Sequence, residues 1–305
     1  MKALVFNNYK DKFKHINKYL NCDEVSFKII KFNNGEGKIY LDESVKNEDV
    51  VIFLDFAGKD TYKYLSKIRE YSKDEYYVEL RRLISALDNP RSISTFLPNI
   101  YASRQNSNNE KESKDYEIFI NDLINLGVNN IICFENHGKD TRIKDFSLSR
   151  LFTNKKYDLV VSPDKGGITR AKEYAKILNC DLYNFEKNRD LNTFVEGRNP
   201  INSYKGKEYD FSFKKILIVD DILDSGSTII NAINKINNCS VDVFVAYPLF
   251  SKGIKEFKKL SKAKKLNKIY ISNLVYFDKS LLKNKFIEVI DCSELVSDAV
   301  KEVIK

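Results

Sequence analysis

The 305-residue chain has no tryptophan, one methionine and two histidines, and its five cysteines are scattered. Because these cysteines lack the spacing of metal ligands, and some stand in or beside apolar runs, they indicate buried thiols rather than disulfides or a zinc site. No run of 18 apolar residues occurs, and the start MKALVFNNYK becomes polar too early for a signal peptide. We therefore expect a cytoplasmic protein that does not enter a membrane.

A compact basic motif is also missing, although the formal net charge is +8. Lysines alternate with acidic residues even in the densest run, Lys252 to Lys268. This pattern argues against a nucleic-acid partner, and polyanionic small substrates explain an excess of positive charge equally well.

Short apolar, β-prone runs alternate with helical patterns along the whole chain, which predicts an α/β fold with parallel sheets. We expect two α/β domains, at 1–153 and 154–283, followed by a strand and a helix at 284–305 that pack back on them. The expected strands lie near residues 2–6, 50–56, 93–97 and 130–134 in the first half, and near Leu159, Leu182, Ile216, Val241 and Ile269 in the second.

The most informative motif is KILIVDDILDSGST, residues 215–228. An apolar strand leads into Asp220 and Asp221, whose carboxylates are suited to hold vicinal sugar hydroxyls directly or through Mg²⁺. The loop Ser225 to Thr228 then opens a helix, so its N–H groups and hydroxyls suit a phosphate monoester. The loop alone fits ordinary turn and helix-cap chemistry equally well, but the complete string indicates a site for a phosphorylated ribose. A P-loop NTPase is disfavoured because the Walker A lysine is missing.

This string resembles the ribose-phosphate loop of the type I phosphoribosyltransferases and of the ribose-phosphate diphosphokinases (PRPP synthetases). The resemblance implies two phosphoribosyltransferase-like domains, each a mostly parallel sheet flanked by helices. It also implies the following ribose-phosphate-binding residues: Asp220, Asp221, Asp224, Ser225, Gly226, Ser227 and Thr228.

A second strand–turn–helix string, YDLVVSPDKGGITRA at residues 157–171, separates these two families. Its paired glycines, Gly166 and Gly167, let the backbone close around a pyrophosphate, and Asp164 offers a hard oxygen ligand for Mg²⁺. The string is similar to the S-P-D-x-G-G-x-x-R-A element of ribose-phosphate diphosphokinases. The implied pyrophosphate loop comprises Asp164, Lys165, Gly166 and Gly167.

Further matches follow in the family's order and imply the residues that bind ATP. Phe32, Asn34 and Glu36 match the F-x-D-G-E turn that reaches the ATP of a neighbouring subunit, with Asn34 in place of the Asp. This match implies a homo-oligomer, a dimer or a hexamer. The other implied contacts are Arg104, Gln105 and His137.

The resemblance implies an ATP-dependent diphosphokinase that transfers the β,γ-diphosphoryl group of ATP to the C1 hydroxyl of ribose 5-phosphate, giving PRPP and AMP. Lys187 and Arg189 match the K-x-R of the mobile catalytic loop, and His137 completes the implied catalytic set. The implied cofactor is Mg²⁺, with His137, Asp164, Asp220 and Asp221 as candidate ligands.

Three departures from the family leave the acceptor open. Ser227 replaces a glycine of the usual D-T-x-G-T loop, residues 60–72 form an insertion, and the loop 106–114 has lost the family's arginines. The acceptor is therefore ribose 5-phosphate or a substituted form such as ADP-ribose, which would give ADP-ribose 1-pyrophosphate and a place in nucleotide or NAD metabolism. A phosphoribosyltransferase and a catalytically silent regulatory paralogue are the remaining alternatives.

Overall fold

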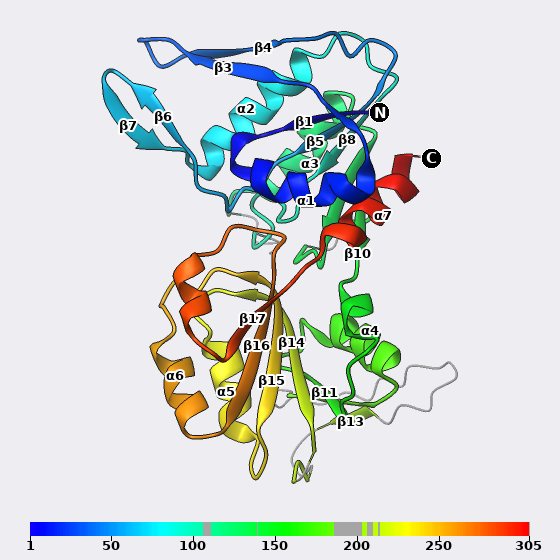
Figure 1. Cartoon of the computed structure of the whole chain (residues 1–305), viewed down its shortest axis with the longest axis vertical. Coiled ribbons are helices and arrows are strands. Elements are labelled where there is room, and N and C mark those ends of the chain that lie inside the picture. Colours follow the sequence, from blue (N-terminus) through cyan, green and yellow to red (C-terminus); the bar gives the residue numbers. More distant parts are fainter. Residues whose placement is uncertain (106–110, 139, 186–202, 206–209, 213, 305) are drawn as a thin grey trace. The chain divides into compact units, whose positions relative to one another are not determined.

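Parallel strands with helices packed on both faces make up each half of the chain in the computed structural model (Figure 1). The structure describes all residues except 106–110, 139, 186–202, 206–209, 213 and 305, and it describes only the backbone of Ser203–Lys205. Two compact units result: unit 1 comprises Met1–Phe146, Leu274–Tyr276 and Ser293–Lys305, and unit 2 comprises Ser147–Asn273 and Phe277–Cys292.

Unit 1 is built on a six-stranded sheet in which every neighbouring pair is parallel. Across the sheet the strands are β10 (Ile143–Phe146), β9 (Asn130–Phe134), β8 (Ser92–Phe96), β5 (Asp49–Phe53), β1 (Lys2–Val5) and β2 (Asp23–Glu24). The central strands β5 and β8 are buried along nearly their whole length because helices cover both of their faces.

Two pairs of helices cover this sheet. On one face α2 (Lys73–Ser85) and α3 (Asp115–Asn125) bury an apolar core that includes Leu80 and Phe119. A capping box at Ser72 and Glu75 fixes the start of α2, since each side chain bonds the other residue's backbone N–H. On the other face α1 (Lys10–Leu20), which follows the short helix η1 (Asn7–Tyr9), packs against α7 (Ser293–Ile304).

Two antiparallel hairpins extend from unit 1 and are absent from the sequence-based strand predictions (Figure 1). The first pairs β3 (Phe27–Lys31) with β4 (Gly37–Leu41). The second pairs β6 (Thr61–Tyr64) with β7 (Lys67–Glu70) and lies within the predicted insertion. Both alternate weakly in hydrophobicity and are half exposed, so the period-2 pattern that identifies a strand is faint.

Unit 2 is built on a seven-stranded sheet that is also entirely parallel. In spatial order its strands are β13 (Ser203–Lys205), β12 (Asp181–Asn184), β11 (Leu159–Ser162), β14 (Ile216–Leu223), β15 (Val241–Pro248), β16 (Leu266–Ser272) and β17 (Ile287–Ile290). The C-terminal strand and helix therefore belong to different units: β17 extends the sheet of unit 2, whereas α7 packs in unit 1.

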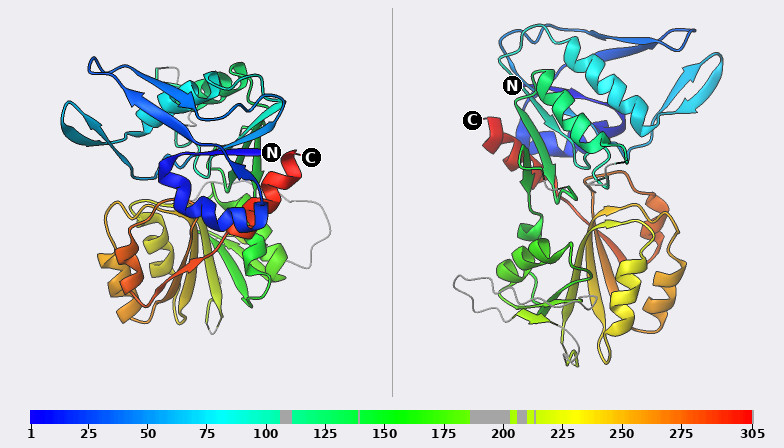
Figure 2. Two further views of the ribbon diagram at one scale, coloured as in Figure 1. Left: turned by 45° about the horizontal axis from the view of Figure 1, so that its top comes forward. Right: turned by 180° about the vertical axis from the view of Figure 1, so that it is seen from behind.

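Helices on both faces also cover the sheet of unit 2, as the rear view of Figure 2 shows. α5 (Ser227–Lys235) and α6 (Lys255–Lys262) lie on one face and bury Ile229, Ile233 and Phe257 against the strands. α4 (Ile168–Leu178) lies on the other face with η2 (Ser149–Phe152), where Phe152 and Tyr174 pack against Phe244. A third short helix, η3 (Lys279–Lys283), precedes β17.

The predicted fold class, two domains with parallel sheets flanked by helices, is confirmed. In such sheets the carboxyl ends of all strands meet at one edge, which is where open α/β folds bind ligands. Among the described residues no helix is long and apolar enough to cross a membrane.

Candidate active site

Two adjacent carboxylates, Asp220 and Asp221, lie within the second half of β14 rather than after its end. β14 pairs with β11 only as far as Ile218, but its pairing with β15 continues to Leu223. Both acidic side chains are buried, with relative exposures of 9% and 4%. The strand therefore holds two acidic groups in a desolvated position at the carboxyl edge of the sheet.

Arg170, in the first turn of α4, neutralises part of this charge. Its guanidinium Nη2 donates to Asp221 Oδ2 at 2.7 Å, and its Nη1 lies 3.9 Å from Asp220 Oδ1. Sequence reasoning named Arg170 only as part of a motif and gave it no role. Arg170 stands in the first turn of a helix that follows a glycine turn, and it faces the neighbouring strand β14. This position is the signal that would have identified it.

The pKa of the Asp220 carboxyl is raised well above its ordinary value. Burial is the largest cause, and the charge of Asp221 adds to it, whereas the guanidinium of Arg170 opposes it. The carboxylate of Asp164 also raises this pKa. A shared cation or a set of sugar hydroxyls would relieve this concentration of negative charge.

The predicted pyrophosphate loop joins β11 to α4 and is closed by its own side chains. Ser162 Oγ donates to the Asp164 carbonyl at 2.7 Å, and the Gly167 N–H donates to Asp164 Oδ1 at 3.2 Å. A Cβ at Gly167 would stand 2.9 Å from Ser162 Oγ, so this turn requires a glycine there. Asp164, Lys165 and Gly166 are exposed, so a ligand can reach them from solvent.

The predicted ribose-phosphate loop, Asp224 to Thr228, joins β14 to α5. Gly226 adopts a left-handed conformation with φ of +76°, and α5 begins at the next residue. Ser225 Oγ and Ser227 Oγ lie 3.0 Å apart, and the side chains of Ser227 and Thr228 are exposed at the positive end of the helix. Ser227 therefore presents a hydroxyl beside the helix N-terminus where the family has a glycine.

Replacing Gly226 with alanine should destabilise unit 2 and distort this loop. The φ of +76° is unfavourable for a residue with a Cβ, and that Cβ would also stand 2.7 Å from two ring carbons of Phe257. The matched control is Gly253→Ala, because Gly253 has a φ of +68° but nothing within 4 Å of its Cβ position.

We expect chemical denaturation to show a loss for Gly226→Ala that exceeds the loss for the Gly253 control by about 1–3 kcal/mol, the usual effect of overpacking. Equal losses for the two variants would mean that Phe257 moves aside freely and that the loop does not need a glycine.

The predicted nucleotide residues Phe32, Asn34 and Glu36 lie at the tip of the β3–β4 hairpin. The turn is closed by a bond from the Phe32 N–H to the Glu36 carbonyl at 2.8 Å, and Asn34 Oδ1 accepts from the Glu36 N–H at 3.1 Å. Asparagine thus keeps an acceptor at the position where the family has aspartate. All three residues are exposed, so they are free to contact a molecule outside this chain.

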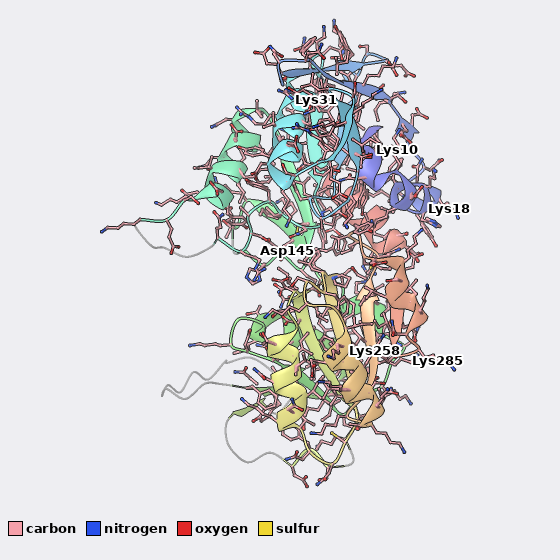
Figure 3. The ribbon with its side chains drawn as sticks, turned by 90° about the vertical axis from the view of Figure 1, so that its left-hand side faces the viewer. Lys10, Lys18, Lys31, Asp145, Lys258 and Lys285 are labelled. Atoms are coloured by element: carbon pink, nitrogen blue, oxygen red, sulfur yellow. The ribbon has the colours of Figure 1, made fainter. Side chains whose placement is uncertain are left out.

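The insertion hairpin β6–β7 supports this turn. Tyr64 Oη donates to the Asn33 carbonyl at 3.0 Å. At the base of the turn Lys31, labelled in Figure 3, forms an ion pair with the buried Glu79 at 2.5 Å, and its Nζ lies 5.1 Å from the ring centre of Tyr62. The insertion hairpin therefore packs against the turn between β3 and β4 in unit 1.

The other predicted nucleotide residues follow adjacent strands of unit 1. Arg104 and Gln105 are exposed after β8, and His137 is half-buried in the loop after β9. Asp145, labelled in Figure 3, holds this loop because its Oδ1 accepts from the Asn136 N–H at 3.0 Å. Since β8 and β9 are parallel neighbours, these residues come from one sheet edge, whereas the turn at Phe32 to Glu36 comes from a separate hairpin.

The predicted catalytic residues Lys187 and Arg189 lie outside the described residues. Within the part of the chain that the structure describes, no group of three or more His, Cys, Asp or Glu side chains is arranged to hold a metal ion by itself. Of the four predicted metal ligands, Asp164, Asp220 and Asp221 belong to unit 2, and His137 belongs to unit 1.

Comparison with known proteins identifies both units. A family model described as the N-terminal domain of ribose phosphate pyrophosphokinase matches residues 1–127, and the phosphoribosyl transferase domain model matches residues 135–278. The ribose-phosphate pyrophosphokinase of Mycoplasma genitalium is 27% identical across 98% of this chain and 90% of its own length. That of Methanobrevibacter smithii is 26% identical across 80% of this chain and 85% of its own length.

A solved structure shows the same fold. The phosphoribosylpyrophosphate synthetase from Mycobacterium smegmatis superposes with a TM-score of 0.76, at 17% identity, over 99% of this chain and 98% of its own. The two family models cover most of the chain in the order expected from its motifs. The chain therefore belongs to the ribose-phosphate pyrophosphokinase family of diphosphokinases.

Proposed function

We propose that this enzyme transfers the β,γ-diphosphoryl group of ATP to the C1 hydroxyl of ribose 5-phosphate, giving PRPP and AMP. The observation that carries the proposal is the buried pair Asp220 and Asp221, held by Arg170 directly before a loop of exposed hydroxyls at a helix N-terminus. The carboxylate pair suits the vicinal hydroxyls of a sugar phosphate, and the loop at the helix N-terminus suits its phosphate.

The reaction needs positions for three groups. Ser225, Ser227 and Thr228 would bind the 5-phosphate, and Asp220 would orient the ring hydroxyls. The C1 oxygen then forms a bond to the β-phosphorus of ATP, the bond from that phosphorus to the α,β-bridging oxygen breaks, AMP leaves and the hydroxyl proton is released. Such a transfer depends on positioning and positive charge more than on covalent help from the protein.

The residues at the loops also fit Mg²⁺. Carboxylate oxygens are the hard ligands that this ion prefers, and Asp164 is exposed. Burial and the neighbouring carboxylates raise the pKa of Asp220, and a cation bound nearby would stabilise its charged form. Asp164 and Asp220 would hold the ion together with phosphate oxygens of the substrate. Bound Mg²⁺ would supply positive charge against the diphosphoryl group. Lys187 and Arg189 would add further positive charge in the transition state.

A substituted acceptor such as ADP-ribose is the second candidate. It is favoured by Ser227, whose exposed side chain replaces a glycine at the phosphate loop and would keep the ligand's phosphate further from the backbone. The chemistry at C1 would be unchanged.

Incubation of the pure protein with Mg²⁺ and ATP labelled at the γ-phosphorus, together with each acceptor in turn, tests the proposal. We expect the label in a sugar 1-pyrophosphate and equimolar AMP, faster with ribose 5-phosphate than with ADP-ribose. A preference for ADP-ribose would select the second candidate. Formation of a nucleotide from PRPP and a base, with release of pyrophosphate, would identify a phosphoribosyltransferase, and no turnover with either acceptor would favour a regulatory paralogue.

We also infer a homo-oligomer, because the exposed turn at Phe32 to Glu36 has the position of a contact to the nucleotide of a neighbouring subunit. Light scattering should give the mass of a dimer or a hexamer, and mixing two inactive variants, one altered at Glu36 and one at Asp220, should restore activity through hybrid sites. A monomer that is fully active would contradict the inference.

A further inference from the structure

Asn184 is the last residue of β12 and carries a buried amide that has no hydrogen-bond partner among the described residues. Its relative exposure is 5%, and neither its Oδ1 nor its Nδ2 finds a hydrogen-bond partner in the part of the chain that the structure describes. Buried amides are almost always hydrogen-bonded, because the loss of their contacts with water is unfavourable. An apolar residue of similar size would fit this position better in the ligand-free protein.

The register of the sheet places this amide under the pyrophosphate loop. Asn184 pairs with Ser162 across the parallel strands β12 and β11, and paired residues point to the same face. The side chain of Ser162 reaches the loop, because its Oγ donates to the Asp164 carbonyl and stands 2.9 Å from the Cβ position of Gly167. The Asn184 amide therefore lies beside Ser162, at the carboxyl edge where the loop begins.

A phosphoryl ligand in this loop would satisfy the amide. The Nδ2 group is a donor that matches a non-bridging phosphate oxygen, and Oδ1 is an acceptor that matches a water on a hydrated cation. An apolar ligand could not form these hydrogen bonds, and no described residue of the loop forms them with the amide.

We propose that Asn184 is a further binding residue for the diphosphoryl group, donating from Nδ2 to one of its oxygens and accepting at Oδ1 from a water on the accompanying cation. The inference rests on the proposed function and extends it by naming a contact beneath the Asp164 to Gly167 turn. It also explains why a polar side chain stands at a buried position of the strand.

Titration calorimetry of the full chain with Mg²⁺ and inorganic pyrophosphate tests this contact. Asn184→Leu should weaken pyrophosphate binding by about tenfold to a hundredfold, as expected when a buried donor to a charged oxygen is removed. The same variant should melt at the same temperature as the wild type or higher. Its affinity for ribose 5-phosphate, which would bind the Ser225 to Thr228 loop, should stay within about twofold of the wild type.

Ser297→Ala is the matched control, because Ser297 Oγ is also buried without a partner among the described residues but lies on α7 in unit 1. It should leave pyrophosphate binding unchanged. If Asn184→Leu does not fold, Asn184→Ala makes the same comparison.

Pyrophosphate affinities of the Asn184 variants within about twofold of the wild type would overturn the inference and would mean that the amide is satisfied by an ordered water or by the chain itself. Failure of the wild-type protein to bind Mg²⁺-pyrophosphate at all would instead count against the proposed function.

Discussion

Replacing Arg170 with methionine should lower the free energy of unfolding at pH 8 by about 3–5 kcal/mol, the usual effect of removing one partner from a buried ion pair. The Arg170 side chain is only 12% exposed and its Nη2 lies 2.7 Å from Asp221 Oδ2, so its removal takes a positive charge away from two buried carboxylates. The loss should shrink at lower pH, because burial raises the pKa of Asp220 and protonation of that carboxyl relieves the repulsion. Activity should fall by at least about a hundredfold, since the acid pair would no longer be held in place.

Two variants control this result. Arg170→Lys keeps the charge but cannot contact both carboxylates with one planar group, so we expect an intermediate loss. In the double variant Arg170→Met with Asp221→Asn, one of the two buried negative charges is also removed, and part of the stability should return. A stability loss of Arg170→Met below about 1 kcal/mol, independent of pH, would show that the carboxylates do not depend on this arginine.

Replacing Asp220 with asparagine should have opposite effects on stability and activity. In the folded protein the pKa of this carboxyl is raised above its ordinary value of 3.8, mainly by burial and then by Asp221, with Asp164 adding to it and Arg170 opposing it. The folded state therefore holds the proton more tightly than the unfolded chain, so this group stabilises the fold below about pH 4, and that contribution is lost as the pH rises through the folded-state pKa. Asparagine does not titrate, so it makes no such pH-dependent contribution to stability.

Chemical denaturation in metal-free buffer should thus show similar stabilities for Asp220→Asn and the wild type near pH 4. At pH 8 the variant should be more stable by about 1–2 kcal/mol, as at other strained active sites. Its kcat should fall by about 10²–10³-fold, a typical loss for a removed electrostatic contact. An equal or lower stability of the variant at pH 8 would contradict the raised pKa, and unchanged kcat would remove Asp220 from the mechanism.

The core strands and helices could be predicted because burial on both faces leaves a strong signal. Runs such as Asn130–Phe134 are continuous apolar segments, and the structure places β9 at these residues. The strand at Ile216 was predicted too short, because its last residues include Asp220 and Asp221, which depart from the apolar pattern. Two acidic residues inside a buried strand break the local apolar pattern, as is expected at a functional site.

The hairpins could not be predicted for a different reason. Leu65 at the tip of the β6–β7 hairpin is 57% exposed and Ile68 within β7 is 79% exposed, so this segment shows neither a buried face nor a clear alternation. Only contacts between distant residues, such as that of Tyr64 with Asn33, reveal that the insertion supports the turn of β3–β4.

Sequence motifs indicate some of the candidate site residues, whereas candidates defined by pairing in space leave no local motif. Asp164 follows the carboxyl end of β11, Asp220 lies in the second half of β14, and the loop at Ser225 follows β14, so the strand–turn–helix pattern assigns all three to one edge of the sheet. Arg170 gains its role from an ion pair across 51 residues of sequence. Asn184 gains its role from register with Ser162, which no local pattern records.

The most direct test of the account is a crystal structure of the protein with Mg²⁺, a non-hydrolysable ATP analogue and ribose 5-phosphate. We expect the sugar phosphate between Asp220 and the Ser225 to Thr228 loop, and the β- and γ-phosphates of the analogue at the Asp164 to Gly167 turn. Density for either ligand bound away from these two loops would contradict the account.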